Sequence, residues 1–555
     1  MTDDFRPSSQ ELWFLPLGGA GEIGMNLNLY GYAGKWLMVD LGVTFGDEST
    51  PGIDVIMPDP AFITERVSDL AGVVLTHAHE DHIGAVPYLW SRLKCPLYAT
   101  PFTASVLRRK LEEVGLQHEA RITEIPMSGK FSVDPFEIEL ITLTHSIPEP
   151  NAVVIRTPLG AVLHTGDWKL DPQPLVGEAT DEAALRKLGN GGVLAMICDS
   201  TNVFVDGTSG SEADVRDSLI EVVGRLKGRV AIGCFASNIA RIETIARVAA
   251  AYDRRVALIG RSLWRMLQAA RENGYLTDLE DFVTEHDVGY FPPDKILMIC
   301  TGSQGEPRSA LARIAREEHP QVKLEAGDTV IFSSRVIPGN EKSIARLQND
   351  LTKLGAEIIT DHDEDIHVSG HPARDELAEM YQWVRPQIAV PVHGEARHIK
   401  EHVAWAKACQ VPEAIEPTNG SLIRLAPGPA AVLSHVTSGR LGLDGNSLVS
   451  MDSDAVRHRH RLSFNGVIMV SVVVGRDGNL LADPQVTLEG LLDGEPAAMA
   501  IAAIAAATRE AIGNLSKPQR QETDAISEAA RLAARRWFNK THDKKPITKV
   551  HVIRL

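Results

Sequence analysis

The densest group of potential metal ligands in the sequence is Thr76-His77-Ala78-His79-Glu80-Asp81-His82. It directly follows the apolar run AGVVL, which is typical of a buried strand. In an extended segment His77 and His79 point to the same side, whereas Asp81 and His82 lie where the chain turns into a helix. A surface loop with histidines by chance is the alternative, but four ligand-type residues so close together favour a site for two neighbouring metals.

Three further candidate ligands each follow a strand-like run. His145 comes after EIELITLT, Asp167 after AVLHTG and His393 after QIAVPV. Each alone could be a hydrogen-bonded core histidine or an aspartate that caps a turn. Because they recur at successive strand ends, we expect all three at one site. His164 lies elsewhere on its strand and is expected in the core.

These ligand types indicate hydrolytic chemistry. Imidazole and carboxylate ligands without thiolates suit Zn²⁺ or Mn²⁺. Two such ions with open coordination positions lower the pKa of a bridging water, which becomes the nucleophile, and clamp a phosphate oxygen during in-line displacement. The pattern therefore predicts a two-metal hydrolase.

Length and composition limit the class of protein. The chain has 555 residues, 44% of them hydrophobic and 23% charged, which predicts two to four globular domains and excludes disordered, collagenous and disulfide-scaffold proteins. The five cysteines are scattered and form no C-x-x-C pair, as expected in a reducing cytosol. The N-terminus has no signal-peptide pattern, and the longest apolar run, residues 497–507, is too short to cross a bilayer. We expect a soluble cytoplasmic protein.

Charge is distributed unevenly. The net charge of −17 disfavours a general DNA-coating role. Residues 517–555, however, hold ten Lys or Arg against four Asp or Glu, so they carry +6 while the rest carries −23. This basic end is either a solvated helix face with a tail or a patch that faces RNA or another subunit.

The hydrophobic pattern predicts four kinds of region. Up to about Asp199 the chain shows short strand-like runs bounded by Gly, Pro, Asp or Asn. From Ser211 to about Arg385, strands alternate with helices, which favours a parallel sheet wrapped by helices. A polar segment up to about Arg461 is typical of a linker. GVIMVSVVVG, two Ala-rich helical stretches and KVHVIRL then indicate a small α/β domain.

A glycine motif near the N-terminus suggests a dinucleotide-binding fold. Gly19, Gly21 and Gly24 form G-x-G-x-x-G, and Asp40 follows sixteen residues beyond Gly24. That fingerprint needs a helix to begin within the glycines. The next residues, MNLNLYGY, alternate like a strand, so we reject a nucleotide cofactor.

The metal-ligand pattern resembles the metallo-β-lactamase superfamily. The resemblance rests on the H-x-H-x-D-H run, His145, Asp167 and the preceding Asp40. It implies that Asp40 orients the ligand loop through hydrogen bonds behind the ligands. Hydrolases of thioesters, lactones, β-lactams and phosphodiesters share these motifs.

Three later motifs narrow the resemblance. Asp199 in ICDSTN, His371 in HVSGHPARDEL and His393 in VPVHGE resemble the motifs of the β-CASP nucleic-acid nucleases. Nearly the whole chain is similar to the bacterial ribonuclease J family. The implied α/β fold is a metallo-β-lactamase αββα sandwich with an inserted β-CASP parallel α/β domain and a small C-terminal α/β domain.

The resemblance also implies domain limits. The sandwich would comprise residues 1–210 and 366–450, the β-CASP domain 211–365, a linker 451–464 and the C-terminal domain 465–555. The segment GVTFGDESTPGID after Asp40 departs from the family, being less acidic and having Gly where the family often shows Pro. Any extra cation site near residues 44–54 is therefore left unassigned.

The family pattern assigns roles to the candidate residues. It implies that His77, His79 and His145 hold one metal, that Asp81, His82 and His393 hold the other, and that Asp167 bridges them. His371 would donate a proton to the leaving 3′ oxygen, with Asp199 orienting it. A buried His–Asp pair with a purely structural role is the alternative for these two.

Two loops are candidates for binding a terminal phosphate. Ala236, Ser237 and Asn238 precede a helix, where free amides favour phosphate. The second loop is His367-Val368-Ser369-Gly370-His371, in which Gly370 would let the backbone approach an anion. Ordinary helix capping is the alternative for each loop. The resemblance implies a pocket for a 5′-monophosphate, and Ser333-Ser334-Arg335 is a further candidate for the same groove.

The sequence thus predicts a two-metal ribonuclease, chiefly 5′→3′ exonucleolytic from 5′-monophosphate ends, with endonuclease activity also open, that acts in RNA maturation and decay. Its partners would be single-stranded RNA and further copies of the chain in a homodimer or homotetramer. A small-molecule hydrolase of the same superfamily is the alternative, and Asp199, His371 and the insertion argue against it. An RNA-binding scaffold without catalysis is disfavoured because every expected ligand is present.

Overall fold

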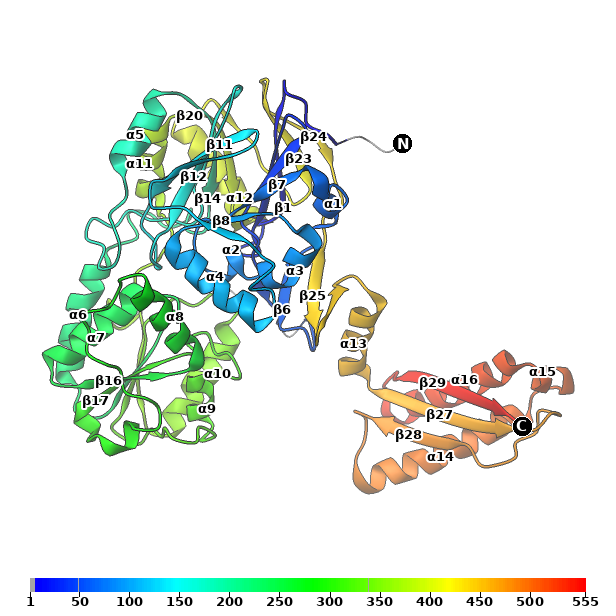
Figure 1. Ribbon diagram of the computed structural model, residues 1–555. Helices are drawn as coiled ribbons and strands as arrows, with labels where there is room; N and C mark the ends of the chain where they lie inside the picture. Colours follow the sequence, from blue (N-terminus) through cyan, green and yellow to red (C-terminus); the bar gives the residue numbers. More distant parts are fainter. Residues whose placement is uncertain (1–4, 48, 338) are drawn as a thin grey trace. The chain divides into compact units, whose positions relative to one another are not determined.

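The computed structural model describes residues 5–47, 49–337 and 339–555. The chain forms two compact units (Figure 1). The first comprises residues up to Thr44 together with Met57–Gly439, and the second comprises Phe45–Ile56 with Arg440–Leu555.

An eight-stranded sheet forms one layer of the first unit, in the order β24-β23-β1-β3-β4-β7-β8-β9. Strands β4, β7, β8 and β9 run parallel, and the others pair antiparallel. The bounds are β1 Leu12–Gly18, β3 Leu27–Tyr32, β4 Lys35–Val39, β7 Leu70–Val74, β8 Leu97–Ala99, β9 Ile122–Glu124, β23 Ser421–Ala426 and β24 Ala431–His435. Strand β3 occupies the segment after the glycine motif, so the strand predicted there is confirmed.

A seven-stranded sheet forms the second layer, in the order β10-β11-β12-β13-β14-β20-β22. The bounds are β10 Lys130–Val133, β11 Phe136–Thr142, β12 Asn151–Thr157, β13 Gly160–His164, β14 Val193–Asp199, β20 Pro386–Val392 and β22 Glu413–Ala414. Its inner face packs on the first sheet in one buried cluster that includes Phe14, Tyr30, Phe136 and Val390.

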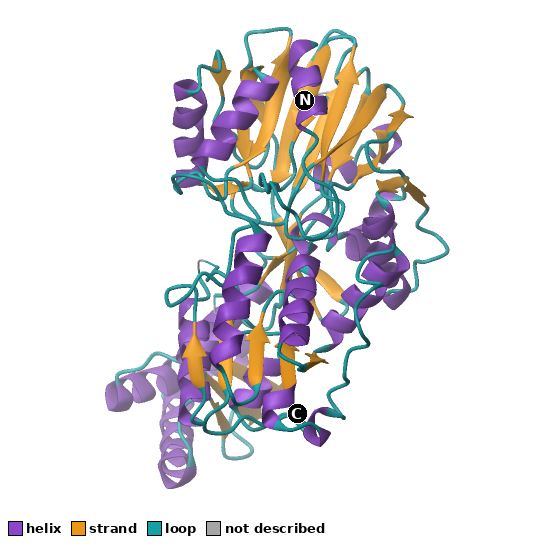
Figure 2. Ribbon diagram, turned by 90° about the vertical axis from the view of Figure 1, so that its left-hand side faces the viewer, coloured by secondary structure: helices purple, strands orange, loops and turns teal. Residues whose placement is uncertain are grey.

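Helices cover the outside of these two layers (Figure 2). On the seven-stranded sheet they are α5 Glu182–Asn190, α11 Arg374–Val384 and α12 Ala396–Ala408, which bury Leu185, Leu377 and Ala406 against it. The shorter helices α2 Glu80–Ile83 and α3 Val86–Leu93, with α4 Pro101–Glu113, follow strands of the first sheet. The expected αββα sandwich is confirmed.

The inserted region forms a five-stranded sheet, in the order β16-β17-β15-β18-β19, whose strands all run parallel (Figure 2). Its strands are β15 Val230–Gly233, β16 Arg255–Ile259, β17 Ile296–Cys300, β18 Thr329–Phe332 and β19 Glu357–Ile359. Its helices are α6 Glu212–Arg225, α7 Ile239–Ala251, α8 Arg261–Glu272, α9 Ala310–Ala315 and α10 Glu341–Lys353. The predicted strand–helix alternation is therefore confirmed.

The second unit ends in a three-stranded sheet, in the order β28-β27-β29, with helices packed on one face. Its elements are β27 Val467–Val474, β28 Gln485–Glu489, β29 Ile547–Arg554, α14 Gly494–Gly513, α15 Lys517–Gln521 and α16 Thr523–His542. Alternate residues of β27 are buried, as expected when one sheet face meets helices. None of the helices in the described part of the chain is long and apolar enough to cross a bilayer.

The segment expected as a linker, 451–464, is largely helix α13, Asp454–Asn465. The Ser453 side chain accepts a hydrogen bond from the Val456 amide and caps this helix. The second unit also takes in residues 45–56, because β6 Val55–Pro58 lies next to β25 Arg440–Asp444 in a four-stranded sheet. Such a pairing between distant segments cannot be inferred from local pattern.

Candidate metal centre

Strand ends bring the predicted ligands to one edge of the sandwich. His145, Asp167 and His393 follow β11, β13 and β20 of the seven-stranded sheet. These strands run in one direction, because β13, β14 and β20 are parallel and both β11 and β13 are antiparallel to β12. The loop after β7 of the other sheet supplies the H-x-H-x-D-H run. The carboxyl ends of strands from both sheets therefore meet at the site.

The ligand atoms form two adjoining groups. Within each group, all ligand atoms lie within 4.8 Å of one another. Asp167 belongs to both groups, and its Oδ2 lies 3.9 Å from His77 Nε2 and 3.2 Å from His82 Nε2. The groups are His77, His79, His145 and Asp167, and Asp81, His82, Asp167 and His393. All seven residues proposed as ligands are thus brought together.

The site fits bound metal ions. His79 Nδ1 lies 3.1 Å from His77 Nε2 and 3.0 Å from His145 Nε2, so three imidazole nitrogens converge. Burial lowers the pKa of His77 and His145 well below the usual value and that of His79 to about 4, which keeps the rings in the neutral form that binds metals. The buried atoms Asp167 Oδ1 and His393 Nε2 have no hydrogen-bond partner within the described residues. Buried lone pairs without a hydrogen-bond partner fit the binding of a cation at this site.

Asp40 lies directly behind the ligand loop, as the resemblance implied. Its Oδ2 is 2.7 Å from His82 Nδ1, and its carboxylate accepts hydrogen bonds from the Thr76 amide and hydroxyl. Although burial opposes protonation, the carboxylates of Asp167, Asp81 and Asp40 raise the pKa of His82. The arrangement fixes the His82 ring with its Nε2 directed at Asp167.

Sequence reasoning missed Asn26. Its amide group lies 3.2 Å from His82 Nε2 and 3.0 Å from His393 Nδ1, so it orients the two rings. A side chain on Gly19 would collide with the Asn26 Oδ1, and the Gly19 carbonyl accepts a hydrogen bond from the His393 amide. The glycine motif that suggested a dinucleotide fold therefore supports the metal centre. Glycines that allow close backbone packing were the signal in the sequence that could have pointed to Asn26.

His371 and Asp199 form the predicted pair beside the metal cluster. His371 Nδ1 is 2.7 Å from Asp199 Oδ2 and 3.9 Å from Asp167 Oδ2. Burial opposes the charged ring, but Asp199 and Asp167 raise the pKa of His371 to about 9. Thr201 donates two hydrogen bonds to Asp199 Oδ1, which keeps this carboxylate in place. The pair can hold a proton close to the cluster.

Gly370 packs closely against a ligand ring. A Cβ there would lie 2.6 Å from His145 Cε1, and its carbonyl oxygen is 2.5 Å from His145 Nδ1. The side of Gly370 on which a Cβ would lie is thus occupied by the His145 ring. The glycine is needed because the loop must pass close to His145.

Some of the polar groups in loop 236–238 already have hydrogen-bond partners within the protein. The Asn238 side chain caps α7 by accepting from the Arg241 amide, and the amides of Asn238 and Ile239 donate to Phe235 O and Ser237 O. Within the described chain the amides of Ala236 and Ser237 and the Ser237 hydroxyl have no hydrogen-bond partner, so these groups of the loop are free to bind an anion.

Arg241 joins the two candidate phosphate loops. Its buried guanidinium donates to Ile366 O and Ser333 O and pairs with Glu212. Burial and the cations Arg241 and Arg335 hold the pKa of His367 well below its usual range, so the ring is neutral. Loops 236–238 and 366–371 are therefore held on one network.

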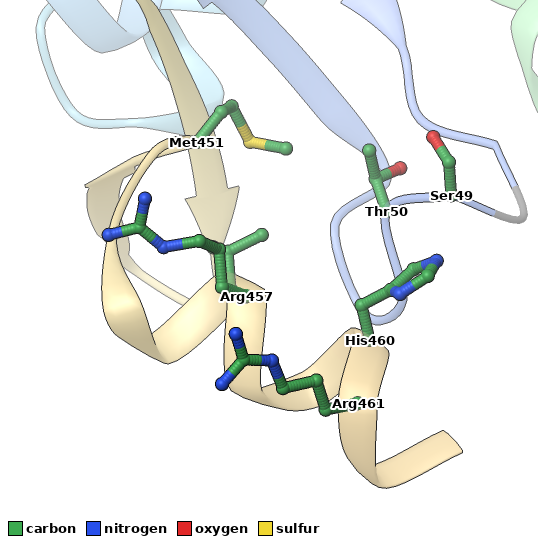
Figure 3. A pocket seen from close by; sticks show the side chains of 7 residues that line it. Ser49, Thr50, Met451, Arg457, His460 and Arg461 are labelled. Atoms are coloured by element: carbon green, nitrogen blue, oxygen red, sulfur yellow. The ribbon is translucent and has the colours of Figure 1, made fainter. Parts of the chain in front are cut away.

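A cavity of about 330 Å³ lies in the second unit (Figure 3). Ser49 and Thr50 line one side, and α13 supplies Arg457, His460 and Arg461. Basic side chains border it, so it suits an anion better than a metal cation. Glu48, which belongs to the segment left open for an extra cation, is outside the described residues.

Family profiles match four parts of the chain. The profile described as "Ribonuclease J, beta-CASP domain" matches residues 227–351, and "Ribonuclease J C-terminal domain" matches 454–555. "Beta-lactamase superfamily domain" matches 50–187, and "Zn-dependent metallo-hydrolase RNA specificity domain" matches 362–412. The matches follow the order in which the sandwich, insertion and C-terminal domain occur.

Curated relatives match almost the full length. A protein named Ribonuclease J from Sinorhizobium meliloti is 45% identical over 552 residues, covering 98% of each chain. Proteins of the same name are 37% identical in Mycolicibacterium smegmatis, covering 97% of this chain and 96% of the relative, and 35% identical in Mycobacterium tuberculosis, covering 96% and 95%.

Among solved structures, the crystal structure of a protein of unknown function from Enterococcus faecalis V583 has a similar fold. The TM-score is 0.53 at 16% identity, and the match covers 75% of this chain and 100% of that one. At this identity the likeness supports the fold alone.

Proposed function

The chain belongs to the ribonuclease J family, and we propose that it acts chiefly as a 5′→3′ exonuclease from 5′-monophosphate ends in RNA maturation and decay. The family makes it a metal-dependent hydrolase acting on RNA. Internal cleavage is a second activity proposed for the same centre. The observation that carries the proposal is the convergence of the ligand histidines on Asp167, next to the His371–Asp199 pair.

The two ligand groups divide between two divalent ions, with Zn²⁺ as the proposed metal and Mn²⁺ or Mg²⁺ as the other candidates. His77, His79 and His145 would hold one ion, Asp81, His82 and His393 would hold the other, and Asp167 would be shared. When bound, such ions acidify water and offset negative charge on a phosphate. The chain itself fixes the ligand rings through Asp40 and Asn26, so that little reorganisation is needed.

His371 is the proposed proton donor. With the pKa raised to about 9, the ring is protonated at neutral pH. Asp199 holds Nδ1, which leaves the other ring nitrogen to donate its proton to the 3′ oxygen as the P–O bond breaks. The contact between the Gly370 carbonyl and His145 Nδ1 places the loop that carries His371 beside the proposed metal ligands.

We assign the preference for 5′-monophosphate RNA ends to the hydrogen-bond network around Arg241. The Ser237 hydroxyl and the loop His367–His371 bind one terminal phosphate, and the cationic Arg335 and Lys169 near His367 add positive potential. A triphosphate adds bulk and charge that this pocket does not accommodate. Exonuclease attack should therefore prefer a monophosphate end.

We assign the proposed functions to the domains expected from the sequence. Residues 1–210 and 366–450 carry the metal centre, residues 211–365 carry part of the phosphate pocket, and residues 465–555 join copies of the chain into a homodimer or homotetramer. Because RNA is the substrate, the cytoplasm is the proposed place of action.

The test uses matched RNAs that differ only at the 5′ end. The protein is incubated with Mn²⁺ or Zn²⁺ and end-labelled RNA carrying a monophosphate, a hydroxyl or a triphosphate, and a circular RNA serves as the control for internal cleavage. We expect mononucleotides, formed fastest from the monophosphate substrate. Equal initial rates on all three linear RNAs would remove the phosphate pocket, and shortened fragments without mononucleotides would contradict the exonuclease assignment.

A further inference from the structure

The end of helix α16 carries a group of basic side chains that have no acidic partner among the residues that the structure describes. Exposed Arg535, Arg536 and Lys540 lie on the helix, and Lys544 and Lys545 follow it (Figure 1). We call these five residues the C-terminal basic patch. Across the described residues, none of the five has a carboxylate oxygen within 4.0 Å.

Two other arginines of the same domain are paired. Arg509 lies 2.6 Å from Asp483, and Arg531 lies 2.6 Å from Glu528. The patch differs from the remaining cations of the domain in its density, because five cations fall within residues 535–545 with only Asp543 among them.

Folding alone does not account for this grouping. Arg536 and Lys540 are four residues apart on the helix, where like charges are destabilising. The helix dipole favours cations in the last turn, which accounts for Lys540, but its effect fades beyond that turn. Arg535 and Arg536 are earlier in the helix and gain nothing from it.

The chemistry around the patch fits a single-stranded polyanion. Half-buried Trp537 and exposed His542, whose ring centroids lie 5.9 Å apart, alternate in sequence with the cations of the patch. Basic side chains interleaved with such rings are typical of surfaces that bind single-stranded nucleic acid. The remaining 516 residues carry −23, which repels RNA and makes a local cationic surface necessary for holding it.

We propose that the C-terminal basic patch binds backbone phosphates of the RNA substrate, as a contact separate from the metal centre and its phosphate pocket. The proposal rests on the proposed function, because it takes RNA as the ligand. The side chains that bury α16 in its domain, Ile526, Ala530, Ala534 and Phe538, point to the opposite side and are not part of the patch.

The test measures the salt dependence of RNA binding. Full-length wild type and Arg535→Gln/Arg536→Gln are titrated with a labelled 30-nucleotide single-stranded RNA in EDTA, which prevents hydrolysis. Glutamine keeps the helix propensity close to that of arginine, so the helix should form. Each lost phosphate contact lowers the slope of log K against log salt by about 0.7, so we expect a decrease of about 1.4 and about tenfold weaker binding at physiological salt.

Two further variants serve as controls. Arg509→Gln/Arg531→Gln removes the same charge from the same domain but from paired arginines, and should weaken binding less than about twofold. Arg535→Lys/Arg536→Lys keeps the charge and should keep the slope. Sedimentation of each variant reports its assembly state.

Equal losses in the two glutamine variants would overturn the proposal, because overall charge would then be responsible. A changed assembly state of Arg535→Gln/Arg536→Gln with RNA affinity like that of the paired-arginine variant would also overturn it and assign the patch to contacts between subunits. A wild-type protein that neither binds nor cleaves RNA would reject the proposed function itself, whereas a wild type that cleaves RNA with an unaltered slope in the variant would reject the patch alone.

Discussion

At the scale of single residues, Asp167 is the side chain on which both ligand groups depend. It belongs to both, and its Oδ1 is buried without a partner. Asp167→Ala should abolish hydrolysis and lower metal content, since it removes the only ligand shared by the two ions. His79→Ala should act in the same direction.

Metal analysis by mass spectrometry and an RNA-cleavage assay check this prediction, with the exposed His435→Ala as the control. Binding of single-stranded RNA should largely survive, because much of the affinity comes from other contacts. Near wild-type turnover with full metal occupancy in either variant would contradict the two-metal assignment.

His371 should affect the chemical step more than metal binding. His371→Ala removes the proposed proton donor, so single-turnover cleavage should slow by about 10²–10⁴-fold, the usual span for a general acid. Its metals should remain, because seven other side chains form the two ligand groups. A His371→Ala protein without metal, together with a His393→Ala protein that keeps it, would reverse the two assigned roles.

His402 predicts acid sensitivity of the fold. It is fully buried between Ser200 Oγ and Tyr381 Oη, each 2.9 Å away, and burial lowers its pKa to about 4. The unfolded ring takes up a proton near pH 6.5, whereas the folded ring stays neutral down to about 4. Stability is therefore lost as the pH falls, by about 1 kcal/mol between pH 7.5 and 5.5.

Urea unfolding at these two pH values, in EDTA so that metal release plays no part, measures that loss. His402→Gln can keep the hydrogen bonds without titrating, so its stability should fall less on acidification than that of wild type. The exposed His435→Gln should behave like wild type. A pH dependence unchanged by His402→Gln would mean that other buried groups are responsible.

At the scale of elements, the start of α7 carries part of the proposed pocket for the 5′ end. Asn238 already caps the helix, so Ser237 is the better residue to change. Ser237→Ala removes a hydrogen bond to a charged phosphate, typically about 1.5–3 kcal/mol, and should reduce the preference for monophosphate ends by about one to two orders of magnitude. Initial rates on matched 5′-monophosphate and 5′-hydroxyl RNAs measure it, and cleavage of circular RNA should be unaffected. An unchanged preference would place the phosphate elsewhere.

The sequence predicts strands and their polar ends well, because each ligand follows an apolar run whose period is local. His145, Asp167 and His393 could therefore be expected at one edge. Asn26 was missed, since its partners His82 and His393 are brought to it only by tertiary packing.

The limit between local pattern and tertiary packing also applies to the two candidate phosphate loops. Ser237 and Asn238 are both typical helix-start residues. The structure shows that the Asn238 side chain is the one that caps α7. The contact of Gly370 with His145 likewise could not be predicted, because the two residues are 225 positions apart in the chain. Residues 45–56 join the second unit through pairing with a strand nearly 400 residues later, which no local pattern predicts.

At the scale of the whole molecule, charge and core are divided between parts of the chain. The proposed metal ligands all precede residue 400, whereas the basic excess lies within 517–555. The buried cluster of the C-terminal sheet contains only residues from Ile468 onward. This end of the chain thus has a core of its own and can contribute contacts to RNA or to other copies without forming the catalytic site.

Deleting residues 465–555 should weaken self-association more than it damages the metal centre. The deletion removes the whole C-terminal core, so it should not expose apolar side chains of the first unit. It also removes the edge strand β29 with its exposed Ile553, together with the exposed Leu555 that follows it, and exposed edges of this kind readily pair with another chain. Sedimentation velocity should show a smaller assembly, while metal content per chain stays close to that of wild type.

The deletion should also reduce affinity for long RNA, because it removes the basic patch. Comparison with Arg535→Gln/Arg536→Gln separates the two effects, since that variant should keep its assembly state and lose only RNA affinity. An unchanged assembly after the deletion would reject the association role of residues 465–555 and leave the patch as their contribution. Loss of metal from the truncated chain would instead show that the first unit depends on this domain for its fold.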